Sequence, residues 1–295
     1  MLYNQIVEEK TMIKFCTDSC VDISKDLIET NEIAVLPLCV ILGGDEYLDG
    51  VNICPQDIFN YVAEHGVLPK TAARSVENYK EFFEENVKDC DHLIYIGISS
   101  QLSSSYANAL GAWEEMGDLK RKIHIIDSKS LSSGIGLLIL YGKKLADLGL
   151  AVEEICEKIV QQVEKNQTSF IVDKLDYLYK GGRCSALARF GATLLNIKPI
   201  LELEQGKIEN TSKLMGKFNL VCKKYIDQVL AKYTNVNADL CFITNTCKDE
   251  EFVNQIVEYV KAKNIFNQVI AQKAGSTISC HCGENTLGIL YLLND

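Results

Sequence analysis

The chain has 295 residues, of which 47% are hydrophobic, and a formal net charge of −10 at pH 7. This length allows one large or two medium domains with a sizeable core. The net negative charge argues against nucleic-acid binding, which requires clustered Lys and Arg. The chain also has no run of five basic residues. No apolar stretch reaches the roughly 20 residues that a membrane span needs.

The cysteines and the first residues of the chain indicate the cellular compartment in which we expect the protein. Twelve cysteines are scattered along the chain and form no CxxC pair. Residues 1–11 carry charges and lack the apolar segment typical of a signal peptide. We therefore expect a cytoplasmic protein with reduced thiols.

The first half of the chain alternates between strand-like and helix-like segments. Strands are expected at residues 13–16, 33–42 with a break at Pro37, 46–49, 93–98 and 123–127. Helices are expected at residues 25–31, 55–65, 76–87, from 106 onward, 134–148 and 152–166, and residues 69–75 are expected to be a loop. This alternation predicts an α/β fold with a mostly parallel sheet. Ligands bind such sheets at the carboxyl ends of the strands, here near Asp18, Ser103 and Ser128.

A second α/β unit is expected to follow. Strands are predicted at residues 168–172, 198–204, 207–209, 239–244, 268–272 and 286–293. Helices are predicted at residues 175–180, 185–195, 217–233 and 250–263, with a loop at 275–283. We expect two closely packed lobes, residues 13–163 and 164–295, rather than two independent domains.

The stretch from Leu93 to Gly111 stands out. An apolar strand-like run ends in the hydroxyl-rich segment 99–105 and then opens into a helix. The first N–H groups of a helix lack internal partners and carry the positive end of its dipole, which favours an anion. The serines are equally explained as helix caps, and the stretch alone does not decide between the two.

Four further side chains are candidate ligands of a carboxylate or phosphate. Thr71 and Ser103 offer hydroxyls in loops, Arg183 follows a double glycine, and His281 lies in a Ser/Cys/Gly-rich segment. Hydroxyl, guanidinium and imidazole donors together suit such an anion. Asp18 and Asp127, each followed by Ser, could orient His281, although capping of a turn is the simpler role.

Other chemistries are less well supported. Cys280-His281-Cys282 places three adjacent candidate ligands on alternate sides of an extended chain, and no second cluster has zinc-site spacing. Neither the dinucleotide fingerprint nor GxSxG is present. Ser103 and His281 could form a nucleophile–base pair, but no third residue that would orient the histidine is evident. We expect no cofactor and no metal.

An ordered set of short motifs resembles the DegV family of bacterial fatty-acid-binding proteins over residues 13–293. The motifs are Thr17-Asp18-Ser19, Ile98 to Ser103 with Tyr106, Asp127-Ser128-Lys129-Ser130, Lys180 to Ser185, Ile197 to Ile200, and His281-Cys282-Gly283. The resemblance implies a two-lobed DegV-like α/β fold with a mostly parallel N-terminal lobe. It also implies a long-chain fatty acid in a tunnel between the lobes.

The resemblance also implies roles for individual residues. By position, Thr71, Ser103 and His281 hold the fatty-acid carboxylate, with Arg183 close by. Some family members present the acid to a fatty acid kinase, so the implied role is that of a carrier without catalysis. A monomer is expected, although the sequence leaves the oligomeric state open.

This chain departs from the family pattern in three places. The family segment Thr-Ser-Gln-Pro is replaced in this chain by Thr71-Ala72-Ala73-Arg74. We expect Arg74 to add a cation near the head group. Leu-Ser-Gly-Thr-Tyr stands as residues 102–106, with serines at 104 and 105. A surface Arg linked to kinase docking corresponds to Met215, so the chain lacks that cation. The alternative function that we retain is an acyl- or phosphoryl-transfer enzyme that uses Ser103 and His281.

Overall fold

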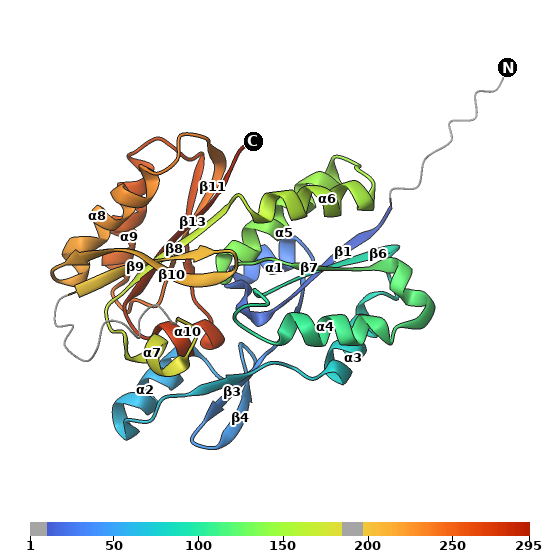
Figure 1. Cartoon of the computed structure of the whole chain (residues 1–295), viewed down its shortest axis with the longest axis horizontal. Coiled ribbons are helices and arrows are strands. Elements are labelled where there is room, and N and C mark those ends of the chain that lie inside the picture. Colours follow the sequence, from blue (N-terminus) through green and yellow to red (C-terminus); the bar gives the residue numbers. More distant parts are fainter. Residues whose placement is uncertain (1–10, 185–196) are drawn as a thin grey trace.

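The computed structural model describes residues 11–184 and 197–295, and its strands there form three sheets (Figure 1). The first is a parallel four-stranded sheet. Its order is β2 (Ala34–Leu36), β1 (Ile13–Asp18), β6 (His92–Gly97) and β7 (Ile123–Asp127). Because these strands run in one direction, the carboxyl ends of β1, β6 and β7 share one rim.

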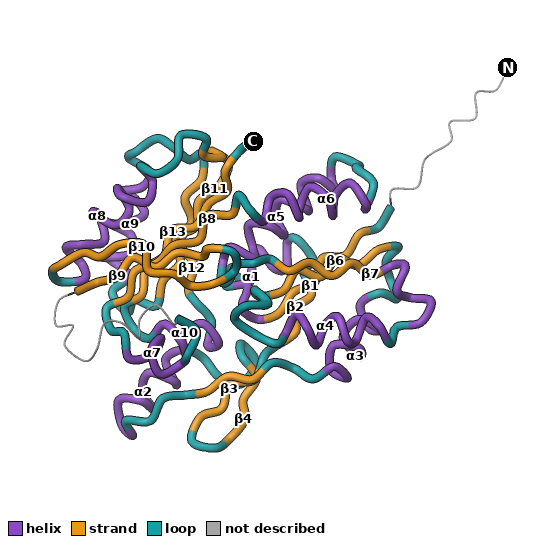
Figure 2. The backbone as a smooth tube through the Cα atoms, in the orientation of Figure 1, coloured by secondary structure: helices purple, strands orange, loops and turns teal. Residues whose placement is uncertain are grey.

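The second sheet has six strands and is mostly antiparallel, with β11 and β12 as its parallel pair. Its order is β10 (Lys207–Met215), β9 (Ile197–Glu204), β8 (Asn166–Val172), β13 (Thr286–Leu293), β11 (Val236–Asn245) and β12 (Gln268–Lys273). The strand nearest the end of the chain, β13, therefore lies in the middle of this sheet (Figure 2).

A small antiparallel sheet packs below both larger sheets in the view of Figure 1. It contains β4 (Asp45–Leu48), β3 (Cys39–Leu42) and β5 (Lys70–Ala72), and α2 (Pro55–His65) lies between β4 and β5 in sequence. The short helix α10 (Ser276–Cys282) packs against α2, β3 and β5. The small sheet thus brings an early segment of the chain next to a late one.

The remaining helices are α1 (Lys25–Thr30), α3 (Val76–Asn86), α4 (Ser105–Glu114), α5 (Ser133–Asp147), α6 (Val152–Val163), α7 (Asp176–Gly181), α8 (Phe218–Leu230) and α9 (Glu250–Lys261). They include six that pack on the large sheets, namely α3, α4, α5, α6, α8 and α9, while α7 packs against α10. Buried side chains of α3 and α4 form one core with β6, and those of α8 and α9 form another with β11 and β13. No helix in the described ranges combines the length and the apolar character that crossing a membrane requires.

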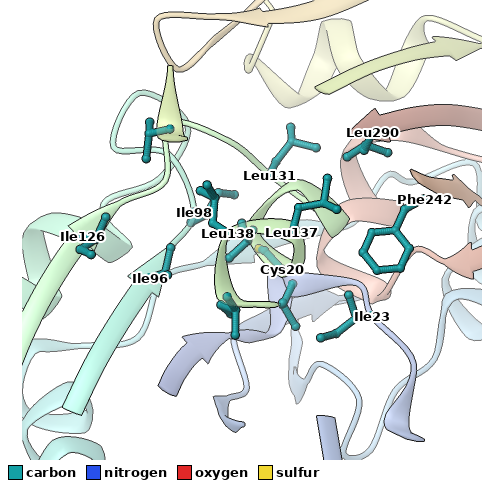
Figure 3. Packing of buried hydrophobic residues seen from close by; sticks show 14 of the residues in the cluster. Cys20, Ile23, Ile96, Ile98, Ile126, Leu131, Leu137, Leu138, Phe242 and Leu290 are labelled. Carbon is teal, nitrogen blue, oxygen red and sulfur yellow. The ribbon is translucent and has the colours of Figure 1, made fainter. Parts of the chain in front are cut away.

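Helix α5 lies between the two large sheets. Its sequence is apolar on nearly every side, the pattern of a helix surrounded by protein. Leu137 and Leu138 of α5 share a cluster with Ile96 of the parallel sheet and with Phe242 and Leu290 of the six-stranded sheet (Figure 3). The two lobes are therefore joined by one continuous core.

The α/β fold with a parallel sheet and a second sheet-containing lobe is confirmed. The segment 33–42 is divided at Pro37 into β2 and β3, as expected. Two expectations are wrong: residues 275–283 contain helix α10 and not a loop, and the loop expected at 69–75 contains β5. Both elements depend on partners distant in sequence. The helix expected at 185–195 lies outside the described residues.

Candidate functional site

Thr71, Ser103, Arg183 and His281 line one cavity of about 370 Å³, which we call the outer cavity. Thr71 belongs to β5, Ser103 to the turn between β6 and α4, and His281 to α10. Arg183 follows α7. Four segments from both halves of the chain thus contribute to a single site.

A hydrogen bond joins Thr71 and His281. The Oγ1 atom of Thr71 lies 2.8 Å from Nε2 of His281, although 210 residues separate them. Pairing of β5 with β3 places Thr71 opposite Val40, and α10 packs on the same strands. The small sheet therefore determines the position of the threonine relative to the histidine.

Two buried carboxylates hold the start of α10. Asp49 accepts hydrogen bonds from the backbone N–H groups of Ser276 at 2.8 Å and Thr277 at 3.0 Å. Asp22 accepts from the N–H of Gly275 at 2.7 Å. These bonds satisfy donors that a short helix cannot pair internally. Neither role is evident from the sequence, because each aspartate holds a helix more than 200 residues away.

His281 is neutral at physiological pH. Burial, with a smaller effect of the Arg183 charge, lowers its pKa to about 4. Its Nδ1 atom is buried and has no hydrogen-bond partner among the described residues. Burying an unpaired lone pair on Nδ1 costs less free energy than burying an unpaired N–H group there. We therefore assign the ring proton to Nε2, which donates it to Thr71.

In the turn before α4, Ser103 bonds to the start of the helix and also borders the outer cavity. Ser103 Oγ accepts from the N–H of Ser105 at 3.2 Å and lies 2.9 Å from Ser105 Oγ. Ser103 also lines the outer cavity. The same hydroxyl therefore satisfies a helix-start donor, and its proton is free for a ligand when Ser105 is the donor of the hydroxyl pair.

Asp18 and Asp127 hold the neighbouring turns. Asp18 accepts from the N–H groups of Ile98 and Cys20, and Asp127 from those of Ser100 and Lys129. Burial raises the pKa of Asp18, and these hydrogen bonds oppose the shift. Neither carboxylate borders the outer cavity. The two aspartates stabilise the turns, which is the simpler of the roles considered from sequence.

A second, narrower cavity of about 60 Å³ adjoins the first and is called the inner cavity. Leu131, Ile208, Ile278 and His281 border both. The hydroxyl-bearing residues around the inner cavity are Ser132, Thr168, Ser169, Thr244, Thr246 and Thr286. Each hydroxyl is hydrogen-bonded to protein, as Thr168 is to Ser130. The inner cavity consequently behaves as an apolar space.

The alternative chemistries find little support in the geometry. Within residues 11–184 and 197–295, no cluster of three or more His, Cys, Asp or Glu is arranged to hold a metal. Cys280 and Cys282 are buried, and burial raises the pKa of both thiols. The histidine bonds to Thr71, whereas Ser103 bonds to Ser105.

Comparison with known proteins decides the family. A family model described as "Uncharacterised protein, DegV family" matches residues 12–294. The chain belongs to the DegV family. A DegV domain-containing protein of Caldanaerobacter subterraneus is 32% identical over 283 residues, covering 95% of this chain and 98% of that protein. One from Clostridium perfringens is 29% identical, covering 94% and 96%.

Solved DegV structures have the same fold. A fatty-acid-binding DegV family protein from Thermus thermophilus superimposes with a TM-score of 0.87 at 27% identity, over 96% of this chain and 100% of that one. DegV from Bacillus subtilis, described as a fatty acid binding protein, gives 0.83 at 25% identity and the same coverage. The fatty acid kinase B3 protein of Streptococcus pneumoniae, loaded with linoleic acid, gives 0.82 at 21% identity, over 96% and 100%, and supports the fold alone.

This DegV protein differs from expectation at Arg74. The Nη1 atom of Arg74 donates to Cys39 Sγ at 3.3 Å, and the side chain lines a groove beside α3 and not the outer cavity. The expected extra cation near the head group is therefore wrong, because the Arg74 side chain is bonded to Cys39 and does not border the outer cavity. Arg183, by contrast, borders the outer cavity, exposed and bonded to the carbonyls of Leu102 and Gly181.

Met215, at the end of β10, is 73% exposed. The position where the family resemblance places a docking arginine is thus on the surface of this DegV protein, but it carries an uncharged side chain.

Proposed function

We propose that this DegV protein binds a long-chain fatty acid, with the carboxylate in the outer cavity and the acyl tail in the inner cavity. The difference in polarity between the adjoining cavities carries the proposal. Hydroxyls, an imidazole and a guanidinium surround the outer cavity, whereas the inner cavity exposes apolar groups. The fatty-acid-binding DegV proteins of Thermus thermophilus and Bacillus subtilis share the fold and lend support.

The proposed contacts form a chain of donors toward the carboxylate. His281 Nε2–H donates to Thr71, which leaves the Thr71 hydroxyl proton for the ligand. Ser103 accepts from the Ser105 N–H and donates its own proton to the ligand. Hydrogen bonds to a charged acceptor are the stronger kind, and they orient the head group. Arg183 adds a positive charge at the mouth of the cavity.

The tail provides most of the binding free energy. Each buried CH₂ contributes about 0.8 kcal/mol, so a C16 tail could contribute up to ~10 kcal/mol before the costs of association. The inner cavity is narrow, and its apolar side chains must move apart to admit a tail. We expect the chain length and unsaturation of the ligand to depend on how far they can move.

We further propose that the protein carries the acid without converting it, and that a fatty acid kinase is a candidate partner. Supporting this, His281 is engaged by Thr71, and no described residue bonds its Nδ1 atom as the third member of a triad would. An activated-serine probe should leave Ser103 unlabelled. Stoichiometric labelling of Ser103 would favour the transferase alternative.

The decisive experiment is identification of the bound lipid. Purified protein is denatured, and the released molecules are measured by mass spectrometry against the protein concentration. We expect about one equivalent of a long-chain fatty acid. Protein that remains empty after incubation with excess palmitate and oleate would refute the proposed function.

A further inference from the structure

Thr277 differs from every other threonine near the two cavities. It lies in the first turn of α10 and lines the outer cavity, and the residue is only 5% exposed. Its Oγ1 atom has no hydrogen-bond partner in the described part of the chain. The hydroxyl was not among the site residues expected from sequence.

A buried hydroxyl without a partner destabilises a protein, because it has given up its hydrogen bonds to water and gained none in return. Elsewhere around the cavities this cost is avoided. The hydroxyls of Thr168 and Thr244 bond to Ser130 and Ser133, and that of Thr71 bonds to His281. The unpaired hydroxyl of Thr277 therefore calls for an acceptor from outside the protein.

The position of Thr277 indicates which part of a ligand it meets. Thr277 and His281 are four residues apart on α10, so their side chains lie one helical turn apart on the same face. Both border the outer cavity, but Thr277 does not border the inner cavity. Thr277 consequently lies beside the head-group donors and away from the tail.

We propose that Thr277 supplies a third hydroxyl donor to the ligand carboxylate, beside Thr71 and Ser103; this inference rests on the proposed function. An ionised carboxylate offers about four lone-pair sites, which is enough for three hydroxyl donors at once. The Asp49 carboxylate fixes the Thr277 backbone N–H and so the base of the side chain. Thr277 thereby raises the preference of the site for an ionised acid over a neutral lipid with the same tail.

The test compares two ligands on three variants. Affinities for palmitate and for methyl palmitate are measured by calorimetry on delipidated wild type, Thr277→Val, Thr277→Ser and the control Thr17→Val. Thr17 is also a buried threonine, but its hydroxyl already donates to the Ile96 carbonyl, and the residue borders neither cavity. Thr277→Val should bind palmitate at least about tenfold more weakly than wild type, which is the loss typical of one hydrogen bond to a charged group. Its affinity for methyl palmitate should change much less.

Thr277→Ser keeps the hydroxyl and should keep most of the preference for the acid, and Thr17→Val should leave that preference unchanged. Equal affinity of Thr277→Val and wild type for palmitate would overturn the assignment, as would an equal loss for acid and ester. If Thr277→Val does not fold, Thr277→Ala serves in its place with the same expectation. Failure of the wild type to bind palmitate would instead refute the proposed function itself.

Discussion

Gly181, in the last turn of α7, lies so close to His281 that a Cβ atom added to it would be 2.8 Å from Nδ1 of the imidazole. The absence of a side chain at position 181 is what allows the ring to reach Thr71. The close approach also explains why Nδ1 has no partner, because glycine offers no side-chain donor or acceptor there.

A Gly181→Ala substitution should therefore displace the His281 ring and weaken its bond to Thr71. We expect at least a several-fold loss of fatty-acid affinity, measured by calorimetry on delipidated protein. Gly111→Ala on α4 is the matched control, since its nearest neighbour is a Val76 methyl at 3.2 Å, far from the site. Unchanged affinity in Gly181→Ala would show that the packing of this glycine does not position the histidine.

The pKa of His281, lowered to about 4, predicts a pH dependence of stability. A buried neutral histidine stabilises the folded state fully above the unfolded pKa of about 6.5, and this contribution is lost as the pH falls toward 4. Delipidated wild type should lose more stability between pH 7 and pH 4 than His281→Gln, by at most about 3 kcal/mol. Urea unfolding of both proteins across this range measures the difference, and parallel curves would contradict the prediction.

Ser103→Ala removes a proposed ligand contact and the acceptor for the Ser105 N–H. We expect about tenfold weaker binding of a fatty acid, with a stability loss of about 1 kcal/mol. Ser100→Ala in the same turn is the control, because Ser100 is exposed and does not line the cavity. Lipid retained through purification, measured by mass spectrometry, should fall only in Ser103→Ala. Equal retention in both variants would remove Ser103 from the site.

Asp49→Ala should destabilise the protein by roughly 2–5 kcal/mol, because it leaves two buried backbone N–H groups of α10 without an acceptor. Asp45→Ala, at the exposed start of β4, should change stability little. Thermal unfolding distinguishes them. A small effect of Asp49→Ala would mean that α10 is held mainly by its apolar contacts.

Much of the fold could be predicted from sequence because it depends on local patterns. The apolar run of β7 and the proline-initiated helix α2 have the bounds that their residues indicate. By contrast, residues 275–283 are expected to be a loop, and glycines do flank the observed helix α10. Its first N–H groups are bonded by Asp22 and Asp49, which no local pattern contains.

The site was predicted in part. The residue types and the family motifs pointed to Thr71, Ser103, Arg183 and His281, which the fold brings to one cavity. Three other features depend on side-chain direction, which spacing along the chain does not reveal. These are the turn of Arg74 toward Cys39, the close approach of Gly181 and the unpaired hydroxyl of Thr277.

The central place of β13 in the six-stranded sheet constrains when the protein can acquire its ligand during biosynthesis. Residues 286–293 pair with β8 on one side and β11 on the other, and the helix that carries His281 directly precedes them. A nascent chain that has not yet released this segment from the ribosome has neither a complete sheet nor a complete site. Loading with an acid must therefore follow translation of β13, and C-terminal truncations that remove it should yield chains that cannot be loaded.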